Sequence, residues 1–145
     1  LSAGVLRNSI TTSDTSSSAT VTLGPFGTNG NSKSVVLSYS CDVGTVGTDN
    51  GAGSTSATIT LERSTNNGAS WTTVTTLTAT GAYFTDTSGG FPIYGGTISG
   101  SVTVTDTPGG TSDFLYRATV TSRSIPTAGG GLYITQRVTI VSTES

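Results

Sequence analysis

The chain has 145 residues and a net charge of −2; 32% of its residues are hydrophobic and only 10% are charged, with Thr, Ser and Gly in their place. A chain of this length sustains one hydrophobic core, so we expect a single domain. Six basic residues are spread among eight acidic ones and no long apolar stretch occurs, so we expect neither nucleic-acid binding nor membrane insertion.

The composition favours strands over helices. Thr is β-branched and fits a pleated sheet, and glycine serves turns that need a positive φ, whereas neither residue supports a helix. Disordered chains usually carry a high net charge and few β-branched or aromatic residues. Here Val, Ile, Thr and Tyr recur in alternating runs and the net charge is small, so we expect a folded, all-β domain.

The segment 1–18 has a short apolar start, and its second half, 11–18, consists of Thr, Ser and Asp alone. Such a segment is typical of a flexible arm, a partner-dependent arm or a linker. We therefore expect an N-terminal arm or linker over 1–18 and the folded domain over 19–145.

Period-two alternation, bounded by turn-forming residues, predicts strands along the rest of the chain. The expected strands are 19–23, 34–42, 57–63, 71–79, 101–106, 114–121 and 132–141. The segment 44–54 predicts a loop, and 81–100, with its Gly pairs and Pro92, predicts a long connection that contains a short edge strand. About eight short strands predict an antiparallel β-sandwich, either a jelly roll or an immunoglobulin/fibronectin-like fold.

The strongest local signal is a hairpin at Asn66, Asn67 and Gly68, because Asn-Gly between two alternating runs is the best short-range mark of one. Residues 64–71, STNNGASW, resemble the Asp-box, S-x-D-x-G-x-[S/T]-W, with Asn66 in place of the aspartate. That motif shapes a hairpin and buries its Trp in sialidase propellers and many secreted β domains, so the resemblance concerns fold and not sialidase activity. We expect a single core that contains Trp71, Ile59, Leu61, Tyr116 and Ala118.

Residues suited to catalysis or metal binding are scarce. Histidine is absent, which removes the most common general base, the usual zinc ligand and the Ser-His-Asp triad. Most aspartates fall at strand ends or in turns, where Asp caps backbone amides, and no phosphate loop or EF-hand spacing occurs. Cys41 is the only cysteine and lies on the apolar side of the run 35–41, typical of a small buried hydrophobe. We expect no enzyme activity, no metal site and no cofactor.

A longer pattern covers about residues 55–145: ITLERS at 59–64, the Asn-Gly hairpin, GSVTVTDTP at 100–108, FLYRATV at 114–120 and QRVTIV at 136–141. It resembles the C-terminal β domains of bacteriophage tail-fibre and other virion-surface proteins. The resemblance implies a structural or receptor-binding domain on the virion surface, or otherwise extracellular. It also implies a homotrimer around a fibre axis that contacts a glycan or protein of the host surface, or another virion protein.

Two other classes of function remain open. A subunit of an extracellular filament or pilus would donate the segment 1–10 as a strand to its neighbour, because an unpaired sheet edge accepts an added strand. A carbohydrate-binding or fibronectin-like accessory module of a secreted protein shares the same pattern of hairpin, Trp and Tyr-x-Ala. Low charge on the strands favours self-association in each case, since little repulsion separates two copies.

The candidate ligand contacts are Tyr83, Phe91 and Tyr94. They belong to an expected loop over 83–94, assisted by the loop 44–54, and loops at the end of a sandwich commonly carry function. Aromatic side chains with polar tips suit sugars and protein patches alike. The alternative is that Phe84, Phe91 and Ile93 close the open end of the core or a subunit interface.

Overall fold

The computed structural model describes residues 5–12, 19–30, 32–46, 54–86, 93–124 and 131–144. The described residues form strands and turns without any helix, as the composition predicts. None of them, accordingly, belongs to a helix of the length and apolar character that crosses a membrane. The strands are β1 (Val5–Thr12), β2 (Thr20–Asn29), β3 (Lys33–Val46), β4 (Ser54–Ser64), β5 (Thr72–Asp86), β6 (Ile93–Asp106), β7 (Gly110–Ser124) and β8 (Gly131–Glu144).

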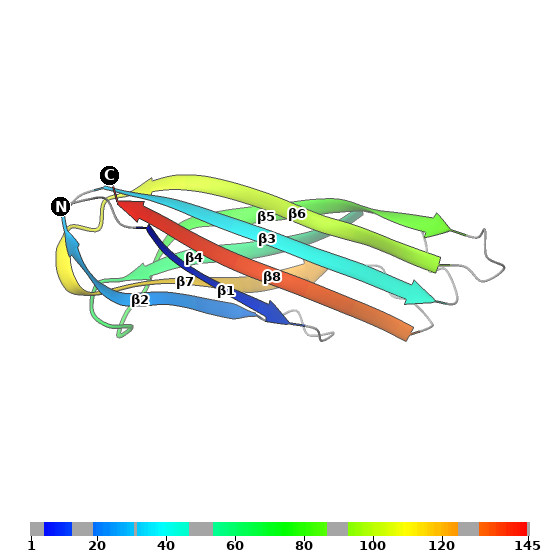
Figure 1. Ribbon diagram of the computed structural model, residues 1–145, viewed down its shortest axis with the longest axis horizontal. Coiled ribbons are helices and arrows are strands. Elements are labelled where there is room, and N and C mark those ends of the chain that lie inside the picture. Colours follow the sequence, from blue (N-terminus) through cyan, green and yellow to red (C-terminus); the bar gives the residue numbers. More distant parts are fainter. Residues whose placement is uncertain are drawn as a thin grey trace.

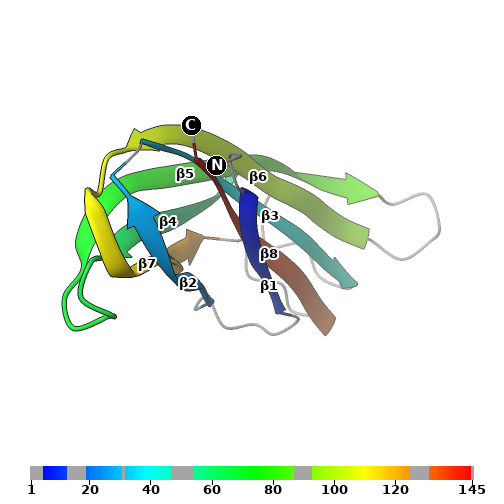
Figure 2. The same ribbon diagram turned by 60° about the vertical axis from the view of Figure 1, so that its left-hand side comes forward.

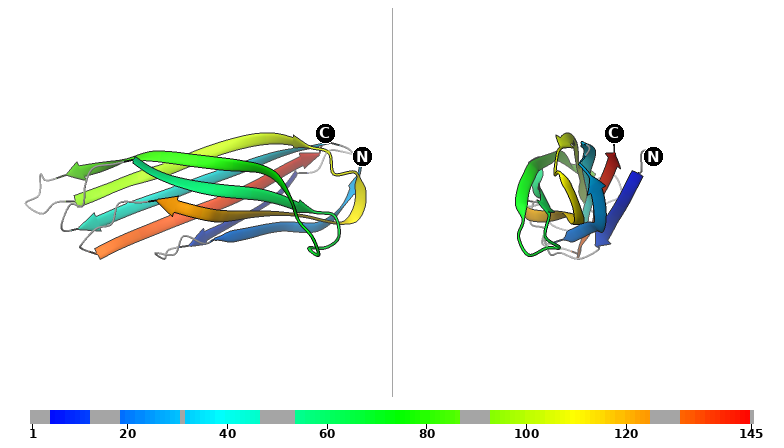
Figure 3. Two further views of the ribbon diagram at one scale, coloured as in Figure 1. Left: turned by 180° about the vertical axis from the view of Figure 1, so that it is seen from behind. Right: turned by 90° about the vertical axis from the view of Figure 1, so that its left-hand side faces the viewer.

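All eight strands belong to one antiparallel sheet in the order β1-β8-β3-β6-β5-β4-β7-β2 (Figure 1). The sheet curls until its two outermost strands, β1 and β2, lie beside each other, as Figure 2 shows. Seen end-on in Figure 3, the strands surround a common interior. The backbone ladder stops between β1 and β2, so the sheet is nearly closed and keeps two free edges at this seam.

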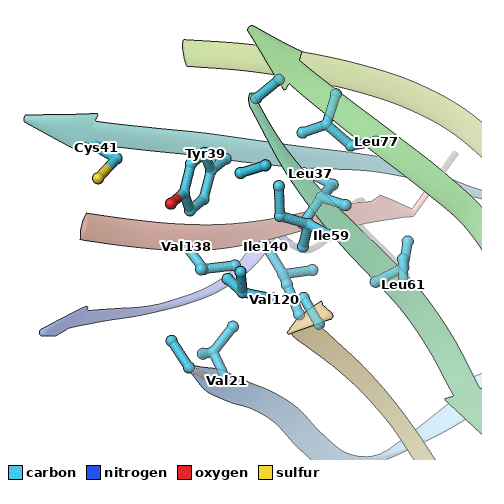
Figure 4. Packing of buried hydrophobic residues seen from close by; sticks show 14 of the residues in the cluster. Val21, Leu37, Tyr39, Cys41, Ile59, Leu61, Leu77, Val120, Val138 and Ile140 are labelled. Carbon is cyan, nitrogen blue, oxygen red and sulfur yellow. The ribbon is translucent and has the colours of Figure 1, made fainter. Parts of the chain in front are cut away.

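Apolar and polar residues alternate along the strands, and the apolar side chains point inward to form the core (Figure 4). On β3 every second residue from Val35 to Cys41 is at most 2% exposed. These side chains meet the inward faces of β4, β7 and β8, which include Ile59, Val120 and Ile140. The expected apolar faces of these strands are confirmed, and Cys41 is a buried free thiol, as predicted.

The segment expected to be an arm or linker contributes a strand to the sheet. β1 runs antiparallel to β8, from Val5 opposite Thr143 to Thr12 opposite Gln136. Asn8 lies opposite the buried Ile140, so a polar residue occupies one of the inward positions of β1. The hydrophobic alternation is broken there, which is why the pattern did not reveal this strand.

Two expected loops are shorter than the sequence suggested. β5 continues to Asp86 and β6 begins at Ile93, between β3 and β5, so the edge strand expected within 81–100 is wrong. Gly81 explains the error, because a Cβ at this residue would lie 1.9 Å from the carbonyl oxygen of Thr97. Glycine here permits the close approach of two strands instead of a turn. The loop expected over 44–54 also loses its ends, since β3 reaches Val46 and β4 starts at Ser54.

The fold has two distinct ends. At the proximal end, β1 begins beside the end of β8, with Val5 opposite Thr143, and short connections join β2 to β3, β4 to β5 and β6 to β7. At the distal end, β1, β3, β5 and β7 end, and the strands that follow them in the chain, β2, β4, β6 and β8, begin (Figure 1). All four of these strand pairs are therefore connected at the end that lies farthest from Val5 and Glu144.

A buried ionic group closes the proximal end. Asp106 is 5% exposed; its Oδ2 accepts a hydrogen bond from the Tyr116 hydroxyl at 2.8 Å, and its Oδ1 is paired with the Arg63 guanidinium. The ring of Tyr116 packs edge-on against Phe114, with ring centroids 4.7 Å apart. Burial raises the pKa of the Tyr116 phenol well above its usual value, and the Asp106 carboxylate adds to this, so the hydroxyl remains a donor at ordinary pH.

Candidate binding surface

The structure brings the two segments of the candidate site together at the distal end. Tyr94, on β6, lies opposite Thr45 of β3 on one side and opposite Thr85 of β5 on the other. Tyr83, on β5, lies opposite Gly96 of β6, two positions further along the same ladder. The ends of the segments 44–54 and 83–94 are thus neighbours in the sheet.

The candidate residues differ from expectation in their local structure. Tyr83 and Tyr94 lie in strands and not in a loop, because β5 and β6 extend further than their glycines suggested. Phe91 lies outside the described residues. The expected loop therefore reduces to the connection between Asp86 and Ile93, which starts and ends on adjacent strands of the sheet.

In the distal half, the apolar core contains one polar pair. The Tyr39 hydroxyl of β3 donates a hydrogen bond to Gln136 Oε1 of β8 at 2.8 Å, and the two residues are 2% and 0% exposed. Burial is the main reason that the pKa values of the Tyr39 phenol and the Cys41 thiol are raised; the Arg123 guanidinium lowers both to a smaller extent. Both groups stay protonated at neutral pH, and a protonated thiol is a poor nucleophile.

Gln136 was not expected in the core. It lies opposite Cys41 on β8 and shares the inward face with Ile134 and Val138. The residues 134, 136, 138 and 140 alternate along the strand, so the pattern itself gave the signal that Gln136 faces inward.

Trp71 lies outside the core, contrary to expectation. Ile59, Leu61, Tyr116 and Ala118 belong to the core as predicted, but Trp71 is only half-buried and precedes β5 at the end of the hairpin. The Arg117 guanidinium carbon lies 4.0 Å from the centroid of the Trp71 ring, in cation–π geometry. Trp71 therefore covers the outer face of the sheet.

Arg117 is held in place by Glu62 on the neighbouring strand. The two residues are direct partners in the β4–β7 ladder, and Arg117 Nε and Nη2 donate to Glu62 Oε1 at 3.2 and 2.8 Å. The alternation of apolar and polar residues predicts that Glu62 and Arg117 both lie on the outer face. Their opposite charges were the signal in the sequence from which this ion pair could have been found. We call Glu62, Trp71 and Arg117 the Trp71 cluster.

The hairpin between β4 and β5 is built around Asn66. Its Oδ1 accepts hydrogen bonds from the Ser64 hydroxyl at 2.8 Å and from the Ser70 amide at 2.9 Å. Asn67 and Gly68 follow with φ values of 58° and 86°, in the left-handed region that Asn and Gly tolerate best. The Asn66 side chain thus holds this turn together, and the turn lies at the proximal end.

Hydroxyl groups form rows across the outer faces of the sheet. One row consists of consecutive ladder partners on β2, β7, β4 and β5: Thr20, Thr119, Thr60 and Thr76. Another crosses β1, β8, β3 and β6: Ser9, Thr139, Ser38 and Ser101. Uncharged rows of this kind leave the outer faces polar without long-range repulsion.

Within the described ranges, no three His, Cys, Asp or Glu side chains gather in a way that could hold a metal ion. No protein-family model, no curated protein and no solved structure matches the chain.

Proposed function

We propose that this chain is a non-enzymatic domain of a virion-surface protein, similar to a tail fibre, that attaches to a host receptor through its distal end. The observation that carries the proposal is the difference between the two ends of the fold. Val5 and Glu144 lie at the proximal end, whereas four strand pairs are connected at the distal end. A domain tethered at its proximal end presents the distal connections outward, and loops on a rigid scaffold are where binding residues concentrate.

The strand order supports a jelly-roll sandwich. Divided between β6 and β5, it gives two four-stranded layers, β1-β8-β3-β6 and β2-β7-β4-β5, which is the strand arrangement of the jelly roll. Viral capsid and lectin domains share that architecture. Because a fold hosts many functions, the strand order supports the virion interpretation without deciding the ligand.

The chemistry of the distal end supports binding over catalysis. The segments 47–53 and 87–92 are rich in Gly and small polar residues. Phe91 belongs to the second segment, and Tyr83 and Tyr94 belong to the strands before and after it. Aromatic rings supply contact area at low entropic cost for a sugar or protein receptor. Burial keeps Cys41 and Tyr39 protonated, so neither serves as a nucleophile at neutral pH.

Self-association is part of the same proposal, with a homotrimer on the virion surface as the preferred state. The free edges at the β1–β2 seam and the uncharged hydroxyl rows support it, since few charges oppose contact between two copies.

The test replaces both tyrosines, Tyr83→Ala with Tyr94→Ala, and measures retention of the domain on a glycan array and on a panel of bacterial cells. Loss of two aromatic contacts should weaken binding by at least about 30-fold, the usual effect of removing residues that dominate an interface. The matched control is Thr76→Ala with Thr78→Ala, two exposed residues elsewhere on β5. Unchanged binding by a folded tyrosine variant, or no binding by the unaltered domain, contradicts the proposal.

A further inference from the structure

β1 has a backbone ladder on one side only. It pairs along its full length with β8 and lies at the end of the strand order. By register, Leu6, Asn8 and Ile10 share the side of the buried β8 residues, but Ile10 alone among them packs against the core. β1 therefore depends mainly on its ladder with β8 and little on burial of its own side chains.

Leu6 marks the weakest part of this attachment. It is 42% exposed, the most exposed large hydrophobic side chain among the described residues, although its ladder partner Ser142 is only 3% exposed. An apolar residue on the inward side of a strand is normally covered by the opposite layer. No described residue covers the Leu6 side chain as fully as Ser142 is covered. An apolar side chain is therefore exposed at the proximal end of the seam between β1 and β2.

A side-chain hydrogen bond, and not a backbone ladder, connects β1 with β2 across the seam. Asn8 Nδ2 donates to the Thr22 carbonyl of β2 at 2.7 Å, and Asn8 Oδ1 accepts from the Ser9 amide at 2.9 Å. The Asn8 amide thus occupies one acceptor on the β2 edge and one donor on the β1 edge. Both bonds are exposed to solvent, where water can replace them.

We propose that β1 is exchanged between copies of this chain, so that β1 of one copy pairs with β8 of the next. The acceptor edge fits the strand by construction, because it already pairs with an identical segment over eight register positions. The connection 13–18, Ser-Asp-Thr-Ser-Ser-Ser, has six residues and can reach about 20 Å when extended. Exchange preserves the β1–β8 ladder, with the same eight pairs of residues opposite each other.

This inference rests on the self-association in the proposed function, and it identifies the interface. The other possible occupant of the seam is a strand from a different protein, added to the free edge of β1 while β1 stays on its own β8. The two arrangements differ in which chain supplies the strand next to β8, and a cross-link between β1 and β8 reports this directly.

The experiment uses Thr11→Cys with Arg137→Cys in a Cys41→Ala background. Thr11 and Arg137 are ladder partners on the exposed face, and directly opposed residues have Cα separations in the disulfide range. The full chain is oxidised at micromolar concentration, or treated with a short bismaleimide if the disulfide does not form, and run on a denaturing, non-reducing gel. A second pair, Ser9→Cys with Thr139→Cys, replaces the first if that variant does not fold.

Exchange predicts covalent bands at two or three times the chain mass, depending on the number of copies. A single band at the chain mass, with the cross-link mapped within one chain, overturns exchange. Light scattering then separates the remaining cases: an oligomer with cross-links inside each chain leaves self-association standing, whereas a monomer contradicts both. The binding test on Tyr83 and Tyr94 is independent of each of these outcomes.

Discussion

Asn8 joins the two free edges of the sheet, because its side-chain Nδ2 donates to the Thr22 carbonyl oxygen at 2.7 Å across the seam between β1 and β2. The same side chain accepts a hydrogen bond from the Ser9 amide. One residue therefore satisfies two backbone groups, the Thr22 carbonyl and the Ser9 amide.

Replacing this residue, Asn8→Ala, should lower the free energy of unfolding by about 1 kcal/mol, since two exposed hydrogen bonds are lost. It should also speed amide hydrogen exchange throughout β1, because the strand then depends on β8 alone. Ser9→Ala keeps the backbone donor and is the matched control. Equal exchange rates in both variants would mean that Asn8 does not hold the seam.

The two buried phenols offer a paired test of the polar groups in the core. Tyr116→Phe removes a donor to the Asp106 carboxylate and should cost about 2 kcal/mol, whereas Tyr39→Phe removes a bond to a neutral amide and should cost about 1 kcal/mol. Urea unfolding of both variants measures the difference. A smaller loss for Tyr116→Phe than for Tyr39→Phe would contradict the ionic role of Asp106.

Trp71 should contribute less to stability than a core aromatic residue. Its ring stacks on Arg117 at the outer face, so Trp71→Ala should cost about 1–2 kcal/mol, below the 3–5 kcal/mol typical of a buried Trp. Ile59→Ala, in the core, should cost about 2–5 kcal/mol. Thermal unfolding of the two variants measures the difference in stability. A larger loss of stability for Trp71→Ala than for Ile59→Ala would contradict the placement of Trp71 outside the core.

Cys41 should make stability fall at alkaline pH. Burial raises the pKa of its thiol in the folded state, so above the ordinary thiol pKa the unfolded chain releases a proton that the folded chain keeps. The contribution is fully present below about pH 8.5 and is lost as pH rises toward the folded-state value. Cys41→Ala should reduce this slope between about pH 8.5 and 9.5, before most tyrosines of the unfolded chain, whose ordinary pKa is about 10, lose their protons. An identical slope in both proteins would show that the thiol titrates normally.

Alternation in the sequence was enough to predict the inward faces of β3, β4 and β7, because apolar and polar residues change places regularly there. It failed at β1, where Asn8 occupies an inward position to bridge the seam. It failed again near Gly81, where glycine serves a close approach of strands and not a turn. In both places a contact between distant segments selects the residue, and a local pattern does not contain that information.

The candidate site was predictable in its composition but not in its arrangement. The sequence drew attention to Tyr83 and Tyr94, but the pairing of β6 with both β3 and β5 determines that their segments meet. Such long-range register follows from the strand order of the whole sheet. Trp71 illustrates the same limit, since its partner Arg117 comes from a strand more than forty residues away in the chain.

The most direct test of distal attachment fixes the domain to a surface in two orientations. Thr107→Cys, between β6 and β7, allows biotin attachment at the proximal end, and Asp86→Cys, the last residue of β5, allows it at the distal end; Cys41 is buried and does not compete for the reagent. Each surface is then tested for capture of cells from the bacterial panel. Capture by the domain fixed through residue 107 and not through residue 86 is the predicted result, and equal capture in both orientations, or capture only through residue 86, would contradict binding at the distal end.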